Sequence, residues 1–235
     1  MDANSSKPGN TIVIKLKQTF VDLDGILAVL NGGWLSSDFI NAYLNMALWC
    51  QNIQISSDVC VMDSYFTQRF PRQKGFELSS RVINGHILGK AQFESAKKIL
   101  IPMNLGNLHW IVAKIDRQTK IIYVYDSQNP QTLRNNYHDP RLETPLESFL
   151  HCKVPGLQFE SEKYQFKYEL STHQNDQVNC GLFTILNLLD QLGLINFRIE
   201  SSREFFRTIR TIFFHELVSA EAFDTSITGF ILNML

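Results

Sequence analysis

The sequence predicts an α+β fold in which a mostly antiparallel central sheet is flanked by helices. Helical patterns dominate before residue 99, three short strand-like runs lie between residues 99 and 126, and helical patterns return after residue 180. Segregated runs of helices and strands are typical of α+β domains. The chain has 235 residues, 44% of them hydrophobic, which is enough to bury one substantial core. We therefore expect one domain over residues 11–235, after a disordered polar tail over residues 1–10.

The first part of the chain predicts one strand and several helices. The run "TIVIKLK" (residues 11–17) has the composition of a short strand. Residues 34–52 place their apolar side chains on one helical stripe, with Ser36 or Ser37 as the N-cap. Two mixed stretches, residues 59–70 and residues 91–98, also fit a helical pattern.

The second part begins with strands and ends with helices. The runs "ILIPMN", "HWIVAKI" and "IIYVYD" are short, rich in β-branched and aromatic residues, and separated by turn-forming residues. After Gly181 a helical apolar face continues until Gly193, a residue type favoured just beyond a helix C-terminus. The run "REFFRTIRTIFFHELV" (residues 203–218) predicts a further helix.

The composition narrows the class of function. The 22 basic and 23 acidic residues leave a net charge of -1, so no global charge favours nucleic acid or an anionic membrane as a partner. The N-terminus lacks a secretory pattern, and no apolar run is long enough to cross a bilayer. The four cysteines lack the paired spacing of a zinc site or a disulfide framework. We expect an intracellular protein, nuclear or cytoplasmic, with free thiols and no metal or cofactor.

Cys180 lies where a polar stretch changes abruptly into a helix, in "QNDQVNCGLFTILNLL". If Asn179 is the N-cap, Cys180 falls in the first helical turn, where free N–H groups and the helix dipole favour an anion. Such a location lowers the pKa of a thiol and favours a nucleophilic thiolate. Gly181 would let a substrate carbonyl approach the backbone without meeting a Cβ. The alternative is a buried packing residue, as most free cysteines are.

His109 and Asp126 are expected at the same end of one β-hairpin. A loop over residues 116–119 would pair Ile115 with Lys120 and place His109 directly opposite Asp126, and a five-residue loop would shift this register by one. Asp126 could then hold the imidazole in one tautomer while the other ring nitrogen faces a thiol. The alternative is that the two residues merely cap polar strand ends.

Four blocks of this sequence resemble one family of enzymes. "LHWIVAKID", "VYDS" and "QNDQVNCGLF" are similar to the His-Trp, Tyr-Asp-Ser and Gln-x-Asn-x-x-Asp-Cys-Gly blocks of the ubiquitin-like-protein-specific cysteine proteases. This is the SUMO protease family of the papain-like clan, which includes the adenovirus protease. "GGWLSSDFINAYLNM" resembles a fourth block, and the four occur in the family's order over roughly residues 30–190. The resemblance implies a papain-like fold with the nucleophile at a helix N-terminus.

The resemblance also implies the roles of individual residues. Cys180 matches the nucleophile, His109 the general base and then acid, and Asp126 the orienting carboxylate. Gln174 matches the glutamine that donates to the oxyanion, with the backbone N–H of Cys180 as a natural second donor.

Trp34 and Trp110 match two tryptophans that, in this family, form the roof and wall of a narrow tunnel for a C-terminal Gly-Gly. Flat rings on both sides would exclude any residue with a Cβ, so glycine becomes the specificity element. Simple core packing is the alternative for each tryptophan.

The sequence departs from the family pattern at three positions. The family commonly has Asp before the cysteine and Asn two residues after the glutamine, whereas this chain has Asn179 and Asp176. Both remain short polar residues suited to caps and turns, so we expect activity to survive. Ser37 replaces a family aspartate that pairs with a basic residue of the modifier, so a preference for SUMO does not carry over through that contact.

The resemblance implies a cysteine protease that cleaves after the Gly-Gly of SUMO or a related ubiquitin-like modifier, in precursor maturation or deconjugation. Its partners would be the modifier and its conjugates, and the chemistry requires only a monomer. Two alternatives remain open. One is an acetyltransferase of the same clan that uses an equivalent Cys-His-acid set, and the other is a catalytically silent module that binds the modifier.

Overall fold

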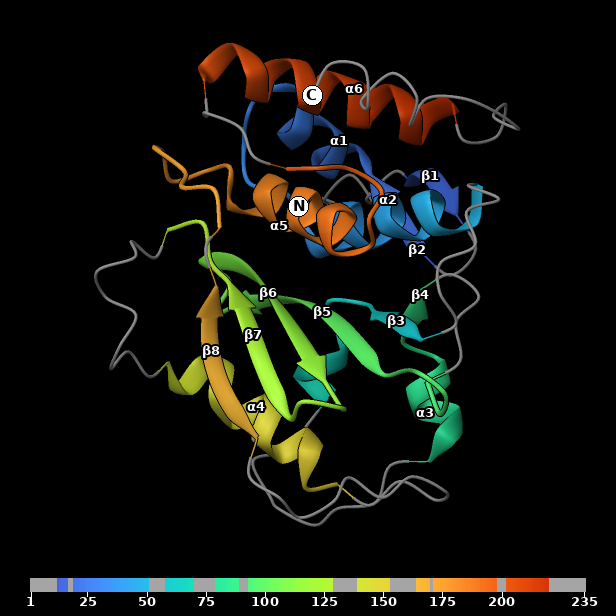
Figure 1. Cartoon of the computed structure of the whole chain (residues 1–235). Coiled ribbons are helices and arrows are strands. Elements are labelled where there is room, and N and C mark those ends of the chain that lie inside the picture. Colours follow the sequence, from blue (N-terminus) through green and yellow to red (C-terminus); the bar gives the residue numbers. More distant parts are fainter. Residues whose placement is uncertain are drawn as a thin grey trace, which may run out of the picture.

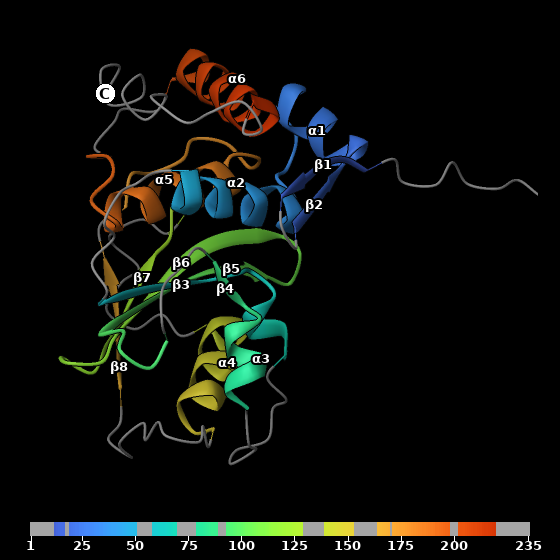
Figure 2. The same ribbon diagram turned by 90° about the vertical axis from the view of Figure 1, so that its right-hand side faces the viewer.

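The computed structural model describes most of the chain, and the following account concerns those residues alone. They are residues 12–16, 19–50, 58–69, 79–88, 93–128, 139–152, 164–169, 171–197 and 202–219. A six-stranded sheet separates two groups of helices (Figure 1). Helices α5 and α2 lie directly on one face, with α6 and α1 beyond them, and α4 and α3 lie on the other side (Figure 2). The expected tail over residues 1–10 falls outside the described part.

The central sheet is mixed and more antiparallel than parallel, as the sequence predicts. Its strands run in the order β4-β3-β5-β6-β7-β8. The pairs β3–β4, β5–β6 and β6–β7 are antiparallel, whereas β3–β5 and β7–β8 are parallel. The strand bounds are β3 Val59–Met62, β4 Ile87–Leu88, β5 Lys98–Leu105, β6 His109–Asp116, β7 Ile121–Tyr125 and β8 Gln165–Glu169.

The remaining elements include the three long helices that the sequence predicts near residues 34–52, 180–192 and 203–218. In α2 the N-cap is Ser36, whose Oγ accepts a hydrogen bond from the backbone N–H of Phe39 at 3.1 Å. A separate hairpin, β1 with β2, precedes α1. The bounds are β1 Ile12–Leu16, β2 Thr19–Asp22, α1 Leu23–Leu30, α2 Ser37–Cys50, α3 Ser80–Asn84, α4 Pro140–Leu150, α5 Cys180–Gln191 and α6 Arg203–Ser219, with a 3-10 turn over Phe66–Arg69.

Two helix predictions were wrong. The stretch 59–70 contains strand β3 and a 3-10 turn, and the described part of 91–98 is a turn followed by the start of β5 at Lys98. Val59, Cys60 and Val61 pair with the first residues of β5, nearly forty positions later. Such a short apolar run has no distinctive period, so its partners in the sheet decide its conformation.

Side chains alternate between two cores along each central strand. On β6, Trp110 and Val112 join the core that contains α2, α5 and α6, while Ile111 and Ala113 join the core beneath α4. This alternation is the two-residue period of a strand that is buried on both faces. It fixes α5 firmly on the sheet, so the N-terminus of α5 has a defined position.

Candidate active site

His109 and Asp126 meet across the β6–β7 hairpin. The Nε2 atom of His109 lies 2.7 Å from Oδ1 of Asp126. The predicted register was wrong by two residues, because Asp116 pairs with Ile121 and the turn spans residues 117–120. A two-residue shift keeps every side chain on its face of the sheet, since side chains alternate with a period of two. His109 and Asp126 are therefore diagonal neighbours instead of direct opposites, and their contact still forms.

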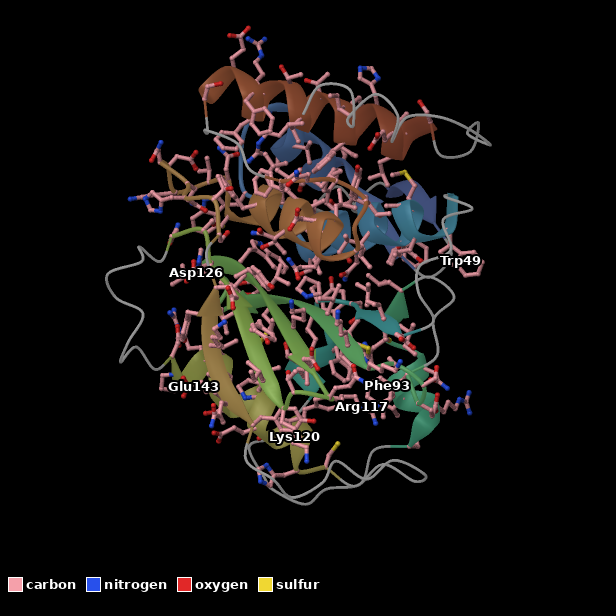
Figure 3. The ribbon with its side chains drawn as sticks, viewed as in Figure 1. Trp49, Phe93, Arg117, Lys120, Asp126 and Glu143 are labelled. Carbon is pink, nitrogen blue, oxygen red and sulfur yellow. The ribbon has the colours of Figure 1, made fainter. Side chains whose placement is uncertain are left out.

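The parallel pair β7–β8 brings two site segments to the same edge of the sheet. Asp126 directly follows β7, and Gln174 lies in the segment after β8. Figure 3 shows Asp126 at the end of the hairpin close to α5, far from Lys120 at its turn. The backbone N–H of Gln174 donates to the carbonyl oxygen of Ser127 at 2.9 Å, which ties the two segments together. Parallel strands have their carboxyl ends on one edge, so this topology gathers the site.

Cys180 is the first residue of α5 and is only 2% exposed. Asn179 occupies the N-cap position as predicted, but its side chain makes no capping hydrogen bond and instead accepts from Arg210. A Cβ on Gly181 would lie 2.9 Å from the Cβ of Leu35. The close packing of α5 against Leu35 therefore requires this glycine, a reason that the sequence did not reveal.

The environment of His109 favours its protonated form. Burial lowers the pKa of the imidazole, but hydrogen bonding and charge interactions with Asp126 and Cys180 outweigh burial and raise the pKa from 6.5 to about 9. The second ring nitrogen, Nδ1, is buried, and because Asp126 holds Nε2, it is the nitrogen through which the ring interacts with Cys180. An imidazole that is oriented in this way is suited to exchange a proton with a neighbouring thiol.

The side-chain amide of Gln174 is buried and fixed at both ends. Its Oε1 accepts a hydrogen bond from Oγ of Ser127 at 2.5 Å, and its Nε2 donates to the carbonyl oxygen of Asp176 at 2.7 Å. An amide nitrogen carries two hydrogens, so one remains for a further acceptor. The orientation of this donor is set before any substrate arrives.

The two tryptophans occupy different environments. Trp110 is buried, and its indole Nε1 donates to the carbonyl oxygen of Leu35 at 3.0 Å. Trp34 is 48% exposed and lines a pocket of about 430 Å³. The other lining residues are Leu108, Gln128, His173, Asp176 and Gln177. Trp34, which was expected to form the roof of the tunnel, is therefore half exposed to solvent. Trp110, the expected wall, belongs to the core.

Sequence reasoning missed two residues that support this site, Ser127 and Arg210. Ser127 stands in the quoted "VYDS" block, which could have indicated it, whereas Arg210 belongs to no recognised block. A second histidine–aspartate pair, His86 with Asp63, has its closest contact at 2.9 Å. His109 differs from His86 because it also interacts with Cys180 through hydrogen bonding and charge.

The described residues include no group of three or more His, Cys, Asp or Glu side chains that could hold a metal ion. Within the same part of the chain, no helix is both long enough and apolar enough to span a bilayer.

Residues 33–189, more than half of the chain, match the model of the Ulp1 protease family, C-terminal catalytic domain. The chain belongs to this family. It therefore carries a Ulp1-type cysteine peptidase domain, and the resemblance inferred from the four sequence blocks is confirmed. The family match ends before α6.

Solved structures of Ulp1-type proteases share the fold of this chain. The Ulp1 protease domain in complex with SMT3, the yeast ortholog of SUMO, is 16% identical with a TM-score of 0.60, over 92% of this chain and 90% of that one. Ulp1 with its catalytic cysteine oxidised to a sulfenic acid is 15% identical with a TM-score of 0.61, over 90% and 89%. The Ulp1-like SUMO protease domain of Chaetomium thermophilum is 14% identical with a TM-score of 0.52, over 89% and 92%. No curated protein sequence gave a significant match.

Proposed function

We propose that this chain is an intracellular protease, nuclear or cytoplasmic, that cleaves after the C-terminal Gly-Gly of SUMO or a related ubiquitin-like modifier. One observation carries the proposal: His109 is bonded to Asp126 at 2.7 Å and interacts with Cys180 at the first turn of α5. The family match supports peptidase chemistry, and nothing in it favours the acetyltransferase or the silent binding module.

In the proposed reaction Cys180 passes its thiol proton to His109, and the resulting thiolate attacks the carbonyl carbon of the modifier's last glycine. The imidazolium of His109, which the raised pKa of about 9 favours, then gives this proton to the departing amine as the C–N bond breaks. A water molecule attacks the thioester with the imidazole again acting as the base, the C–S bond breaks, and the modifier leaves with a free carboxylate while the thiol of Cys180 is restored. Asp126 keeps the imidazole oriented and stabilises its positive charge.

Negative charge develops on the carbonyl oxygen during both steps. We assign its stabilisation to the backbone N–H of Cys180 and to the remaining amide hydrogen of Gln174. Donors that are already fixed when charge develops contribute most, because no reorganisation is needed at that moment. The bonds of Gln174 to Ser127 and Asp176 supply this rigidity.

The test is capture of the proposed nucleophile. The full chain is incubated with a panel of ubiquitin-like modifiers that carry C-terminal thiol-reactive groups, and covalent adducts are detected by mass. We expect a one-to-one adduct with at least one modifier, absent in Cys180→Ala and retained in Cys152→Ala, a matched change at another buried cysteine. Adduct formation in folded Cys180→Ala, or none in the wild type with any modifier, contradicts the proposal.

A further inference from the structure

A chain of hydrogen bonds runs from α6 to the proposed oxyanion site. The guanidinium of Arg210 donates to Oδ1 of Asn179, from Nε at 3.0 Å and from the second terminal nitrogen at 2.7 Å. Asn179 in turn donates from Nδ2 to Oδ2 of Asp176 at 2.7 Å. The backbone carbonyl of Asp176 accepts the hydrogen bond from Gln174. This series of hydrogen bonds begins on α6, a helix outside the matched family region, and ends at Gln174, a proposed catalytic donor.

The donor-to-acceptor direction of these hydrogen bonds is fixed by Arg210 at one end and Asp176 at the other. A guanidinium can only donate hydrogen bonds, and an ionised carboxylate can only accept them. Asn179 stands between them with one accepting and one donating atom, so only one orientation of its amide satisfies both neighbours. The other carboxylate oxygen of Asp176 accepts from the backbone N–H groups of Val178 and Asn179, both at 2.9 Å. Asp176, Val178 and Asn179 are therefore tied to one geometry directly before Cys180.

The burial of Arg210 favours a positioning role over a simple contribution to stability. Arg210 is 4% exposed, and its third guanidinium nitrogen is buried without a hydrogen-bond partner in the described part of the chain. Burying a charged group with an unsatisfied donor costs free energy. Its other contact, to the carbonyl oxygen of Val178 at 3.2 Å, again reaches the segment that leads into Cys180.

We propose that Arg210, Asn179 and Asp176 are positioning residues that hold the two oxyanion donors, the backbone N–H of Cys180 and the amide of Gln174. The inference rests on the proposed function, since it assigns a purpose to those donors. It also explains why this chain has Asp176 and Asn179 where the family commonly has Asn and Asp: the two side chains bond to each other, so exchanging them together preserves the pair.

The numbers of donors and acceptors at positions 176 and 179 make the exchange of Asp and Asn testable. With Asp176→Asn alone, the new amide has one oxygen for two sets of donors, and no amide flip avoids a donor–donor contact with Asn179, Arg210 or the backbone. With Asn179→Asp alone, two carboxylate oxygens face each other where a 2.7 Å hydrogen bond stood. With both changes, the new carboxylate at position 179 accepts from Arg210 and from the new amide at position 176. The oxygen of that amide still accepts from the backbone N–H groups.

The experiment is a double-mutant cycle in the full chain, read out with the modifier identified by adduct capture. We expect each single change to lower kcat by about 10- to 100-fold, because both oxyanion donors are displaced, with little change in KM. The double variant should recover kcat to within about threefold of the wild type. A modifier with a C-terminal aldehyde, whose tetrahedral adduct places an oxygen at the oxyanion position, should lose and regain affinity in parallel. Binding of the free-acid product should stay unchanged.

A second pair of variants keeps the test decisive if a single change fails to fold. Arg210→Lys retains a donor-only side chain, whereas Arg210→Met removes the donor, so the lysine variant should keep far more activity than the methionine variant. The inference is overturned if Asp176→Asn and Asn179→Asp each keep a kcat near that of the wild type. It is also overturned if the kcat of the double variant is no higher than that of the less active single variant.

Failure of the proposed function gives a different pattern. In that case no variant cleaves any modifier, yet the urea midpoints of the four cycle proteins still report whether the two exchanges compensate. Compensation in urea without compensation in kcat refutes the positioning role alone.

Discussion

Replacing Asp126 with asparagine removes the negative charge beside His109 and preserves the shape of the side chain. The pKa of His109 is raised from 6.5 to about 9. At about 1.4 kcal/mol per pKa unit, the folded protein favours the imidazolium by about 3 kcal/mol, after the opposing effect of burial. Asp126 and Cys180 must together supply more than this amount, so removing either should lower the pKa measurably.

The assay is a pH titration of the ring-carbon NMR signals of labelled histidine. We expect a midpoint near 9 in the wild type, lower midpoints in Asp126→Asn and in Cys180→Ala, and a midpoint below 6.5 when both changes are combined, because only burial then remains. In activity measurements, the alkaline limb near pH 9 should move to lower pH in Asp126→Asn.

The same shift makes a prediction about stability. The folded-state pKa of His109 exceeds its unfolded value, so its contribution is fully present below pH 6.5 and is lost as pH rises through 9. The free energy of unfolding should therefore fall by up to about 3 kcal/mol over that window, and by less in Asp126→Asn. A titration midpoint that stays near 9 in Asp126→Asn would refute the role of the carboxylate.

Three further changes test other parts of the structure. Burial raises the pKa of Glu216, which accepts a hydrogen bond from Tyr43, from 4.5 to about 7, so wild-type stability should decrease as pH rises from 4.5 to 7. In Glu216→Gln this slope should disappear in urea titrations, and an unchanged slope would exclude Glu216 as its source. Gly181→Ala places a Cβ 2.9 Å from Leu35, so the free energy of unfolding should drop by about 1–3 kcal/mol. Combining it with Leu35→Gly, which removes the Cβ that the new methyl group would meet, should cost less than the sum of the two single changes, and strict additivity would argue against the clash. Trp34→Ala removes a half-exposed ring, so we expect stability within about 0.5 kcal/mol of the wild type and a lower kcat/KM for the modifier, and equal loss of both would indicate a folding defect.

Elements with sustained apolar patterns were predictable from sequence, and shorter ones were not. Helices α2, α5 and α6 and strands β5, β6 and β7 each carry enough periodic residues to define their type. Strand β3 has only four residues, and its conformation depends on pairing with β5 and β4. Helix α4 was missed although Asp139 and Pro140 form a recognisable helix start, with the Asp139 side chain accepting from the N–H of Arg141.

Some residues of the site were predictable from sequence and others were not. The predicted hairpin brought His109 and Asp126 together despite a register error, because a shift of two residues keeps both side chains on the same face of the sheet. Arg210 could not be inferred, since it reaches Asn179 from a helix thirty-one positions further along the chain and only tertiary packing determines that contact. Gly181 was singled out from the sequence, but its proximity to Leu35 depends on how α5 packs and could not be predicted.

The hydrogen bond from Trp110 to the peptide oxygen of Leu35 bears on how such proteases diversify. A backbone oxygen persists through any substitution at position 35, so this link to the segment that carries Trp34 is insulated from mutation. Ser37 and Asp38, at the start of α2, are not buried, and Asp38 accepts a hydrogen bond from the hydroxyl of Tyr65 at 2.7 Å. A substitution at Ser37 or Asp38 therefore leaves the link between Trp110 and the backbone of Leu35 in place, because that link uses no side chain of the segment before α2.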